Sequence, residues 1–415
     1  MHAPDSPDSL PVLVVGAGVA GLTAALDLAA LGIPVVLVER EGCLGGQAVR
    51  LDKLYPSDHC GFCPVWTDAA ACLAHPLITL HRHTSLEGLA EEDGRIMAQL
   101  AASPPAVDLD ACVFCGLCLD ACEARGVPGT IKMRLEGMLS APDTPPVPYL
   151  NPVLCSRCGE CAGACPTGAI DPLRLDRPPQ EVRLPVADVI FATGFTENDT
   201  TMVPEYLPDS HPDIFSALDF EAWTSEAGPN AGRIARRSNG KTPRSIGFIQ
   251  CVGSRDQRFQ PYCSSVCCMH ALKQARWAKR RLPAASVAIF FTDLRAIGKG
   301  YEAYARAAAK EGVLLVRSRP GLVFCLPEEG GGSTPAVHYE DTGSGELITA
   351  EFDIVVLNGG LTACPMPGRS GSSTQTGSAC GFCEEPADVS RSVVQGSRAA
   401  ALVAMRLASR TGGGL

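Results

Sequence analysis

The stretch that decides the fold is VLVVGAGVAGLTAALDLAALGIPVVLVER, residues 12–40. It begins with a short apolar run typical of a buried strand and continues with helical spacing of leucine and alanine over residues 21–31. A second apolar run, Val35 to Val38, ends beside the acidic Glu39. Because glycines and a proline interrupt the apolar residues, the stretch predicts strand, helix and strand rather than a membrane-spanning helix.

The turn between this strand and helix has the pattern Gly16-x-Gly18-x-x-Gly21. The first glycine permits a tight turn, the second lets a pyrophosphate approach the backbone, and the third lets the helix pack closely on the sheet. The helix N-terminus favours the anion, and a carboxylate at the position of Glu39 can accept hydrogen bonds from a ribose. Together these features predict a dinucleotide site, with a plain tight turn as the alternative.

Further segments indicate which dinucleotide is bound. A Gly-Gly-Gln sequence follows the second strand, an Ala-Thr-Gly sequence ends a strand predicted over residues 188–193, and a Gly and an Asp precede the closing helix. These features resemble thioredoxin-reductase-like flavoproteins, and the resemblance implies FAD rather than NAD. The residues expected to bind FAD are Gly16, Gly18, Gly21, Glu39, Gly45, Gly46, Gln47, Thr193, Gly194, Gly381 and Asp388.

Two cysteine runs give the most specific chemical signal. They read Cys112-x2-Cys115-x2-Cys118-x3-Cys122 and Cys155-x2-Cys158-x2-Cys161-x3-Cys165. In this pattern three thiolates of one run hold one cubane, and the fourth ligates the other. We therefore expect two [4Fe–4S] clusters, the first held by Cys112, Cys115, Cys118 and Cys165 and the second by Cys155, Cys158, Cys161 and Cys122. Zinc is the rival metal, and a disulfide framework is a more distant rival.

A third group of cysteines lies in IQCVGSRDQRFQPYCSSVCCMHALK, residues 249–273. The segment follows a predicted strand, at the place where a two-domain reductase would begin its second nucleotide-binding turn, but no G-x-G-x-x-G follows. The pattern alone leaves open whether these cysteines ligate a cluster or are buried or redox-active thiols. The group consists of Cys251, Cys263, Cys267 and Cys268.

Several segments resemble the A-type subunit of heterodisulfide reductase. The resemblance implies that the third group of cysteines ligates a [4Fe–4S] cluster near the flavin. It also implies that Lys273 lies close to the isoalloxazine ring, where a cation would favour the reduced, anionic flavin. A solvated lysine on a helix is the alternative. Apart from the two cysteine runs, the resembling segments are LDKLYPSDHCGFC (51–63), CVGSRD (251–256), YCSSVCCMHALK (262–273), DLRAIGKGYE (293–302) and EEPADVSRSV (384–393).

The sequence departs from the full-length family pattern at both ends. It starts at the first flavin strand and stops after the closing helix, so we expect neither a preceding cluster domain nor a C-terminal ferredoxin. Shorter relatives include a flavin subunit of a quinone-interacting oxidoreductase. These departures leave open the electron donor, the acceptor and whether electron bifurcation occurs.

The remaining cysteines carry weaker signals. The pairs Cys60 with Cys63 and Cys380 with Cys383 are compatible with metal ligands, a redox pair or buried thiols. We expect His59 to be a surface histidine. Four further cysteines are expected to be packing residues, namely Cys43, Cys72, Cys325 and Cys364.

The fold class expected is α/β, a thioredoxin-reductase-like, two-lobed, Rossmann-type FAD-binding fold with an inserted α+β bacterial-type 2[4Fe–4S] ferredoxin. Further strands are predicted at 245–250, 286–291, 313–316 and 352–357, and helices at 265–281, 301–310 and 389–406. The expected division is a flexible tail at 1–10, FAD-binding parts at 11–102, 179–240 and 352–415, the ferredoxin insert at 103–178, and a degenerate nucleotide-binding-like domain with the third cluster at 241–351.

Length, net charge and cysteine content exclude some classes of function and favour others. A chain of 415 residues suggests two to three domains, and a net charge of -10 argues against binding nucleic acid or anionic lipid. Twenty cysteines, behind a polar start without a basic signal region, indicate metal chemistry in the reducing cytoplasm. Any membrane association is expected to go through partner subunits.

We expect an oxidoreductase, specifically the FAD and iron–sulfur electron-transfer subunit of a heterodisulfide-reductase-like or quinone-interacting complex. Its expected partners are the other subunits of that complex, and a homodimer is also compatible with the sequence. One rival is a self-contained NAD(P)H-dependent flavoprotein reductase with a ferredoxin insert. The other is an assembly protein whose clusters are structural.

Overall fold

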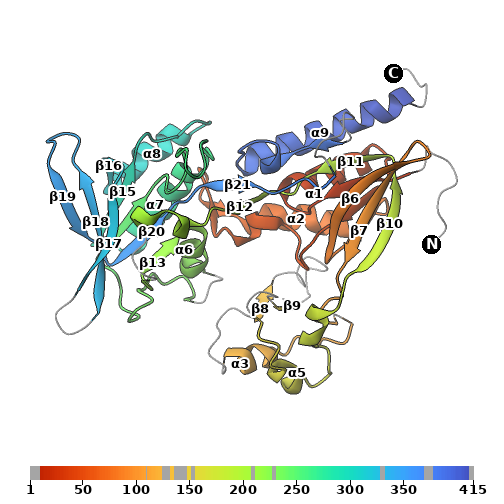
Figure 1. Ribbon diagram of the computed structural model, residues 1–415, viewed down its shortest axis with the longest axis horizontal. Coiled ribbons are helices and arrows are strands. Elements are labelled where there is room, and N and C mark those ends of the chain that lie inside the picture. The colour runs from red at the N-terminus through yellow and green to blue at the C-terminus, as the bar shows by residue number, and fades with distance from the viewer. Residues whose placement is uncertain are drawn as a thin grey trace.

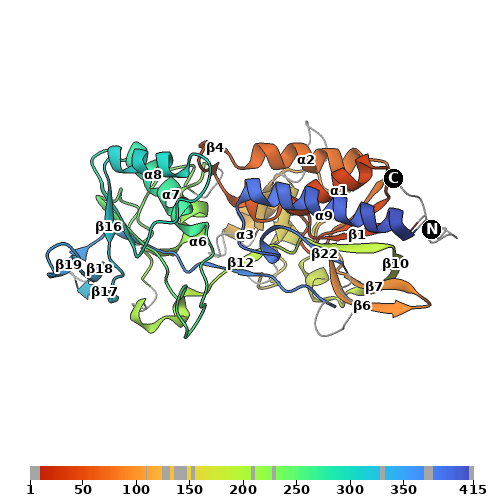
Figure 2. The same ribbon diagram turned by 90° about the horizontal axis from the view of Figure 1, so that it is seen from above.

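The protein is described by a computed structural model, which covers residues 10–108, 110–123, 131–134, 147–150, 155–206, 211–226, 230–327, 332–368 and 377–410. Figure 1 shows two α/β lobes side by side, with a smaller unit carrying α3 and α5 beneath the first lobe. The view from above also separates the two lobes, with the chain crossing between them near β12 (Figure 2).

The first lobe is built on a parallel sheet of five strands in the order β22-β11-β1-β2-β5. Strands β1 and β2 are buried along their whole length, which explains their uninterrupted runs of valine and leucine. Helix α9 packs on α1. The elements are β1 (Val12–Val15), α1 (Val19–Ala30), β2 (Val35–Val38), α2 (Phe62–Ala74), β5 (Ile78–His81), β11 (Asp188–Phe191), β22 (Ser378–Ala379) and α9 (Val389–Arg410).

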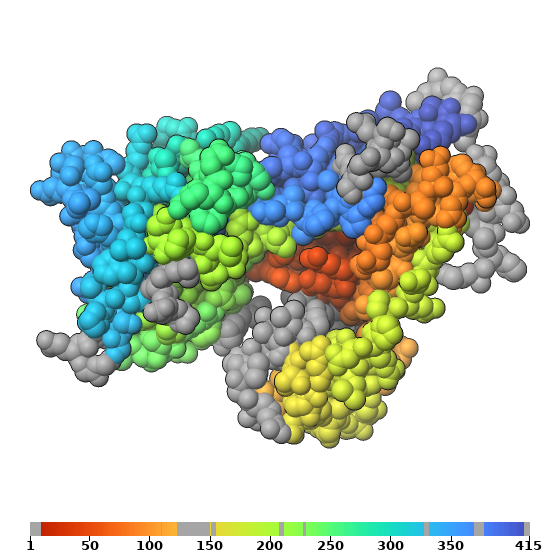
Figure 3. Space-filling model, viewed as in Figure 1, coloured from red at the N-terminus to blue at the C-terminus, as the bar shows by residue number. Residues whose placement is uncertain are grey.

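The cysteine insert, residues 103–179, leaves and re-enters the first lobe at one place. Strands β7 (Arg95–Ala102) and β10 (Gln180–Val186) pair antiparallel, so that Ala102 lies opposite Gln180, and β6 (Thr84–Glu92) pairs with β7 on its other side. A folded unit can therefore be inserted here without disturbing the host sheet. Figure 3 shows it projecting below the first lobe. Its described elements are α3 (Leu117–Glu123), β8 (Ile131–Arg134), β9 (Val147–Leu150) and α5 (Glu160–Ala164).

The second lobe repeats the plan with a parallel sheet in the order β13-β20-β14-β15-β16. A smaller antiparallel sheet, β17-β18-β19, packs against it through residues such as Phe290, Val323 and Phe352. The elements are β13 (Ile214–Ser216), α6 (Ala217–Thr224), β14 (Ser245–Ile249), α7 (Cys267–Arg281), β15 (Ser286–Phe291), α8 (Tyr301–Lys310), β16 (Val313–Arg317), β17 (Leu322–Pro327), β18 (Ser333–Glu340), β19 (Leu347–Glu351) and β20 (Ile354–Leu357).

Two of the expected domain boundaries need correction. Strand β13 falls in the range 179–240 and β20 in the range 352–415, both assigned from sequence to the FAD-binding parts. The structure places both strands in the sheet of the second lobe, where β13 pairs with β20 and β20 pairs with β14. Short apolar strands look alike in sequence, and nothing local specifies which of two sheets they join.

A two-stranded ribbon connects the lobes. Strand β12 (Phe195–Glu197) pairs antiparallel with β21 (Leu361–Ala363), so the outgoing and returning crossings run side by side. Backbone hydrogen bonding extends this pairing, since the Asn198 amide donates to the Gly360 carbonyl at 3.0 Å. The ribbon therefore fixes the carboxyl end of β11 relative to that of β20.

Both parallel sheets have a topological switch point, where the chain order reverses beside a central strand. In the first lobe it lies between β1 and β11, and in the second lobe between β14 and β20. Ligands of open α/β sheets bind at the carboxyl ends of the strands beside such a point. The fold therefore provides one candidate site in each lobe.

No helix in the described part of the chain is both long and apolar enough to span a bilayer.

Candidate functional site

A pocket opens at the switch point of the first lobe, enclosing about 1530 Å³ with its open mouth included. Every residue expected to bind FAD lines it except Gly21, which packs α1 against the turn. These expected residues come to the pocket from four separate parts of the chain. The lining residues from the expected set are Gly16, Gly18, Glu39, Gly45, Gly46, Gln47, Thr193, Gly194, Gly381 and Asp388.

The glycines of the first turn are required by close backbone approach. Gly16 has φ +102°, and a β-carbon there would stand 2.4 Å from the carbonyl oxygen of Ala192. A β-carbon on Gly21 would stand 1.9 Å from the carbonyl oxygen of Gly16. Neither position tolerates a side chain without a shift of the backbone that would cradle a pyrophosphate.

Replacing Gly21 with alanine is therefore expected to weaken FAD binding by about tenfold, since overpacking of this kind costs roughly 1–3 kcal/mol and tenfold corresponds to about 1.4 kcal/mol. Fluorescence titration of the deflavinated protein with FAD measures the change. Gly321→Ala is a matched control, since a β-carbon at Gly321 meets nothing within 4 Å. Equal affinities in both variants would show that the turn does not hold the dinucleotide.

Glu39 orders the same turn. One carboxylate oxygen accepts from the Ala17 amide at 2.8 Å, and the other accepts from the Glu41 amide at 2.9 Å. Burial raises the pKa of Glu39, while these two amides act in the opposite direction. The side chain therefore stands at the end of β2 facing the glycine turn, as the sequence predicts for a ribose-binding carboxylate.

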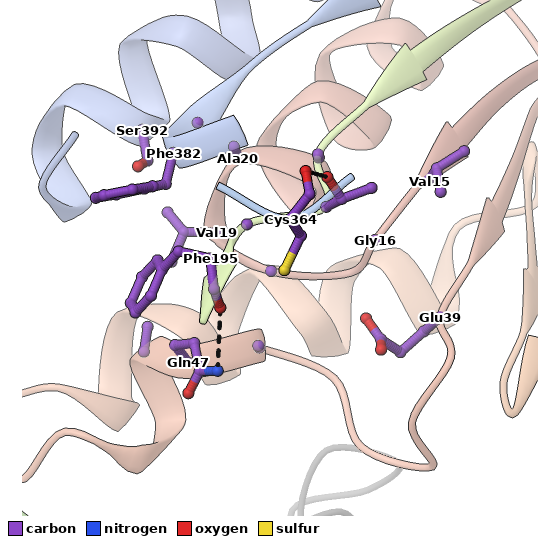
Figure 4. A pocket seen from close by; sticks show the side chains of 18 of the residues that line it. Val15, Gly16, Val19, Ala20, Glu39, Gln47, Phe195, Cys364, Phe382 and Ser392 are labelled. Carbon is purple, nitrogen blue, oxygen red and sulfur yellow. Dashed lines mark hydrogen bonds between the residues drawn. The ribbon is translucent and has the colours of Figure 1, made fainter. Parts of the chain in front are cut away.

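The floor of the pocket carries an unpaired polar atom. Gln47 Nε2 donates to the Phe195 carbonyl at 3.4 Å, but Gln47 Oε1 is buried without a partner among the described residues. Figure 4 shows Gln47 facing the pocket below Phe195 and Phe382, whose ring centroids lie 4.8 Å apart. A flavin supplies N–H and O–H donors as well as a flat apolar ring, so these residues fit FAD.

Sequence reasoning missed Phe195, Cys364 and Phe382 as pocket residues. Phe195 directly follows the Ala-Thr-Gly sequence, and this position next to expected FAD-binding residues could have identified it as a pocket residue. Cys364, expected only to pack, is buried and also lines the pocket, with its carbonyl accepting from Thr193 Oγ1 at 3.3 Å. Figure 4 shows this bond at the edge of the pocket. No local pattern distinguishes these apolar residues from ordinary core.

Asp388 joins the pocket to the second lobe. Its carboxylate accepts from the Arg391 amide at 2.8 Å in the first turn of α9, and its other oxygen accepts from the hydroxyl of Tyr301 on α8. The tyrosine ring stacks edge-on against Tyr55, with centroids 5.4 Å apart. A residue expected only to complete the flavin site therefore also contacts the neighbouring lobe.

The two runs of the cysteine insert have matching backbone geometry. Phe114 and Arg157 occupy equivalent positions with φ of 55° and 58°, and the following Gly116 and Gly159 have φ of 78° and 82°. Left-handed residues at such spacing turn successive amide groups toward one point, which is the arrangement that holds iron–sulfur clusters and other anions. The repeat in sequence is therefore also a repeat in conformation.

The two runs also approach each other. Cys118, Cys155 and Cys161 are buried in one core, with Cys112, Cys122 and Cys165 packed against it. Burial and then Cys155 raise the pKa of Cys161 to about 11, and Cys118 and Cys122 of the other run add to the shift. Cys122 thus lies near the second run, as expected if it is the fourth ligand of the second cluster. Cys115 and Cys158 are exposed.

The third group of cysteines lines one small cavity at the switch point of the second lobe. The chain enters it through Cys251, Gly253 and Arg255, which have φ of 62°, 74° and 57°. Cys267 and Cys268 approach from the first turn of α7. The structure thus brings Cys251, Cys263, Cys267 and Cys268 together, although they come from an extended loop and a helix.

The surroundings of these thiols suit a cluster. The Ser265 amide donates to Cys263 Sγ at 3.3 Å, which is the direction of hydrogen bonding that stabilises a cluster-bound thiolate. Among the described residues, no three His, Cys, Asp or Glu side chains lie close enough to enclose a single metal ion. A cubane has a separate iron for each thiolate, so its four ligands surround a wider space than those of one ion.

Lys273 does not line the FAD pocket. Its Nζ lies 2.5 Å from Glu221 Oε1 and 2.9 Å from the Lys53 carbonyl oxygen, and both charged side chains are 4% exposed. The alternative of a solvated helix lysine is therefore wrong. Its proximity to the flavin ring stays a prediction, and in this structure its charge is balanced by Glu221.

The remaining cysteine pairs differ from each other. Cys383 donates to the carbonyls of Phe191 and Cys380 and is buried, while Cys380 is also buried and lines the FAD pocket. Cys60 is half-buried at the end of β4 (His59–Cys60), while Cys63 is exposed in the first turn of α2. His59 is exposed, as expected.

Family comparisons identify two segments. Residues 11–54 match the family of FAD dependent oxidoreductases, and residues 148–171 match the 4Fe–4S binding domain. Among solved structures, the chain is similar to thioredoxin reductase from Lactococcus lactis, with a TM-score of 0.51 at 13% identity over 96% of this chain and 99% of that one. These findings confirm the expected fold and its cluster-binding insert.

Curated relatives are similar over most of the chain. The sequence is 36% identical over 360 residues to the A-type iron–sulfur subunit of CoB--CoM heterodisulfide reductase from Methanocaldococcus jannaschii, covering 85% of this chain and 54% of that protein. It is 34% identical over 426 residues to the second A-type iron–sulfur subunit of the same enzyme in Methanopyrus kandleri, covering 96% of this chain and 64% of that protein. The chain thus spans between about half and two thirds of the length of these relatives. The chain is thus similar to the A-type subunits of heterodisulfide reductase over most of its length, and it carries an FAD dependent oxidoreductase segment and a 4Fe–4S binding segment.

Proposed function

We propose that the chain is an electron-transfer subunit of a heterodisulfide-reductase-like complex. It binds one FAD in the pocket of the first lobe, two [4Fe–4S] clusters in the cysteine insert and a third in the cavity of the second lobe. Electrons pass between the flavin and iron–sulfur partners, and the substrate chemistry belongs to other subunits. We expect it to work in the cytoplasm, with any membrane contact made through those subunits.

The observation that carries this proposal is the short connection between the two switch points. Gly360 lines the cysteine cavity and directly precedes strand β21 (Leu361–Ala363). Cys364 directly follows that strand and lines the FAD pocket. At about 3.3 Å per residue of extended strand, four residues span roughly 13 Å.

The position of Tyr55 also supports closeness of the two sites. Burial raises the pKa of Tyr55, and Asp388 at the FAD pocket and Cys267 at the cysteine cavity both add to the shift. The phenol therefore lies within electrostatic range of both sites. Its ring stacks edge-on against Tyr301, whose hydroxyl donates to Asp388 at the FAD pocket.

The chemistry of the expected groups suits a relay. A flavin exchanges two electrons and a cubane exchanges one, so adjacent sites join two-electron and one-electron partners. The residues of this chain orient the flavin at the glycine turn, exclude water between the sites and supply amide groups toward the cysteine sulfurs.

The rival of a self-contained NAD(P)H reductase is less well supported. It needs a second dinucleotide site at the carboxyl edge of β14. Gln250 and Cys251 stand there, where a glycine-rich turn would be required for a pyrophosphate. The cysteine thiols and the pyrophosphate would compete for the same space.

Anaerobic reduction of the purified chain, loaded with FAD and iron, tests the proposal. We expect a reduced low-potential ferredoxin to bleach the flavin and to generate EPR signals from the clusters within seconds to minutes. NADH and NADPH are expected to leave both unchanged over the same time. Dithionite serves as the reference for full reduction.

Two outcomes would contradict the proposal. Rapid bleaching of the flavin by NADH or NADPH in the isolated chain would favour the self-contained reductase. Clusters that stay EPR-silent across the whole range accessible to dithionite would favour a structural role for the iron.

A further inference from the structure

Two buried amide side chains stand side by side at the switch point of the second lobe. Gln250 directly follows β14 and Asn358 directly follows β20, and these parallel strands are in register, with Ile249 opposite Leu357. The Asn358 amide donates to the Ile249 carbonyl at 2.9 Å, which fixes the two ends together. Both side chains are only 2% exposed.

Neither side-chain amide group is satisfied. Gln250 Nε2, Gln250 Oε1 and Asn358 Nδ2 are buried without a hydrogen-bond partner among the described residues. A buried N–H group without an acceptor costs free energy. Two such amides beside one cavity therefore point to a ligand that has acceptor atoms.

Both amides line the cavity of Cys251, Cys263, Cys267 and Cys268. Other polar residues of that cavity have partners. Ser254 Oγ lies 2.9 Å from the Gly359 carbonyl oxygen, and Arg255 forms an ion pair with Asp293 at 2.7 Å. Of the described side chains that line this cavity, only those of Gln250 and Asn358 carry buried nitrogen or oxygen atoms without a partner.

We propose that the side-chain N–H groups of Gln250 and Asn358 donate hydrogen bonds to sulfur atoms of the third cluster and thereby raise its reduction potential. This inference rests on the proposed function, because it needs a cluster in the cavity. A reduced cluster carries one more negative charge than an oxidised one, and donors bind the more negative form more strongly. The two amides therefore favour transfer of an electron from the flavin side onto this cluster. They are positioning residues, since the cysteines hold the iron.

The test compares midpoint potentials of the third cluster by EPR-monitored redox titration. Gln250→Leu and Asn358→Leu remove the donors and keep side chains of similar size. Each is expected to lower the equilibrium constant for reduction about tenfold, a shift of about 59 mV to more negative potential for one electron. Gln257→Leu is the matched control, because Gln257 is an exposed amide in the same segment.

Iron analysis separates this inference from the proposed function. If the unchanged protein lacks a third cluster, the proposed function fails in that respect whatever the variants do. If the unchanged protein and the variants all contain the cluster and their potentials agree, the inference is overturned.

A second measurement does not depend on the variants folding. Pulsed EPR of the reduced, unchanged protein, labelled with ¹⁵N only in glutamine and asparagine side-chain amides, is expected to show coupling of this nitrogen to the third cluster. Absence of coupling would show that a buried water, rather than the cluster, satisfies these groups, and would also overturn the inference.

Discussion

Replacing Cys267 and Cys268 together with alanine is expected to lower the iron content from about twelve to about eight atoms per chain. Both thiols line the cavity at the switch point of the second lobe, and removing two of four ligands leaves too few to hold a cubane. Alanine is a strong helix former, so α7 should still begin at residue 267.

Iron and sulfide analysis together with EPR of the reduced protein measures this loss. The signals of the clusters in the cysteine insert should remain, because their ligands lie in a separate unit. Cys325→Ala, on β17, is the matched control and should keep all the iron. A double variant with undiminished iron would show that these cysteines are packing thiols.

Replacing Lys273 with methionine is expected to destabilise the protein by about 3–5 kcal/mol, the usual cost of stranding one partner of a buried ion pair. Glu221 would lose its contact with Lys273 while remaining buried beside Gln274, whose Nε2 lies 3.0 Å away. Lys273 and His270 hold the pKa of Glu221 well below its usual range against the effect of burial, so the carboxylate is ionised. Because this pKa is lowered on folding, the contribution to stability is present above about pH 4.5 and is lost as the pH falls.

Urea denaturation of the single and double variants measures this effect. Glu221→Gln combined with Lys273→Met should recover most of the loss, because no charge is then left buried. Arg306→Met, which breaks an exposed pair with Glu302, is the control and should change stability by less than about 1 kcal/mol. A Lys273→Met variant as stable as this control would contradict the buried-pair account. A shift in flavin potential in the same variant would support the predicted proximity of Lys273 to the ring.

Much of the first lobe follows from its sequence. The strands predicted at the start of the 12–40 stretch, at 35–38 and at 188–193 match β1, β2 and β11 to within two residues, because each is a short apolar run bounded by glycine or a charge. The glycines expected to bind FAD were predictable as turn residues for a related reason. Close approach of backbone to backbone at Gly16 and Gly21 admits no side chain, so the requirement appears directly in the sequence.

Other features could not be predicted, because they depend on long-range contacts. Strands β13 and β20 join the second sheet through pairing with each other and with β14, which no local pattern specifies. The pairing of Lys273 with Glu221 joins residues on α7 and α6, 52 positions apart. Gln250 and Asn358 carry no signal in sequence, and their importance arises only from the register that places them together.

The central claim is that a flavin and three clusters occupy one chain, and the most direct test is cofactor analysis of protein purified without oxygen. We expect about twelve irons and about twelve acid-labile sulfides per chain, as required for three cubanes, together with a single FAD. About eight irons would contradict the third site beside the flavin, and zinc in place of iron would contradict the relay altogether.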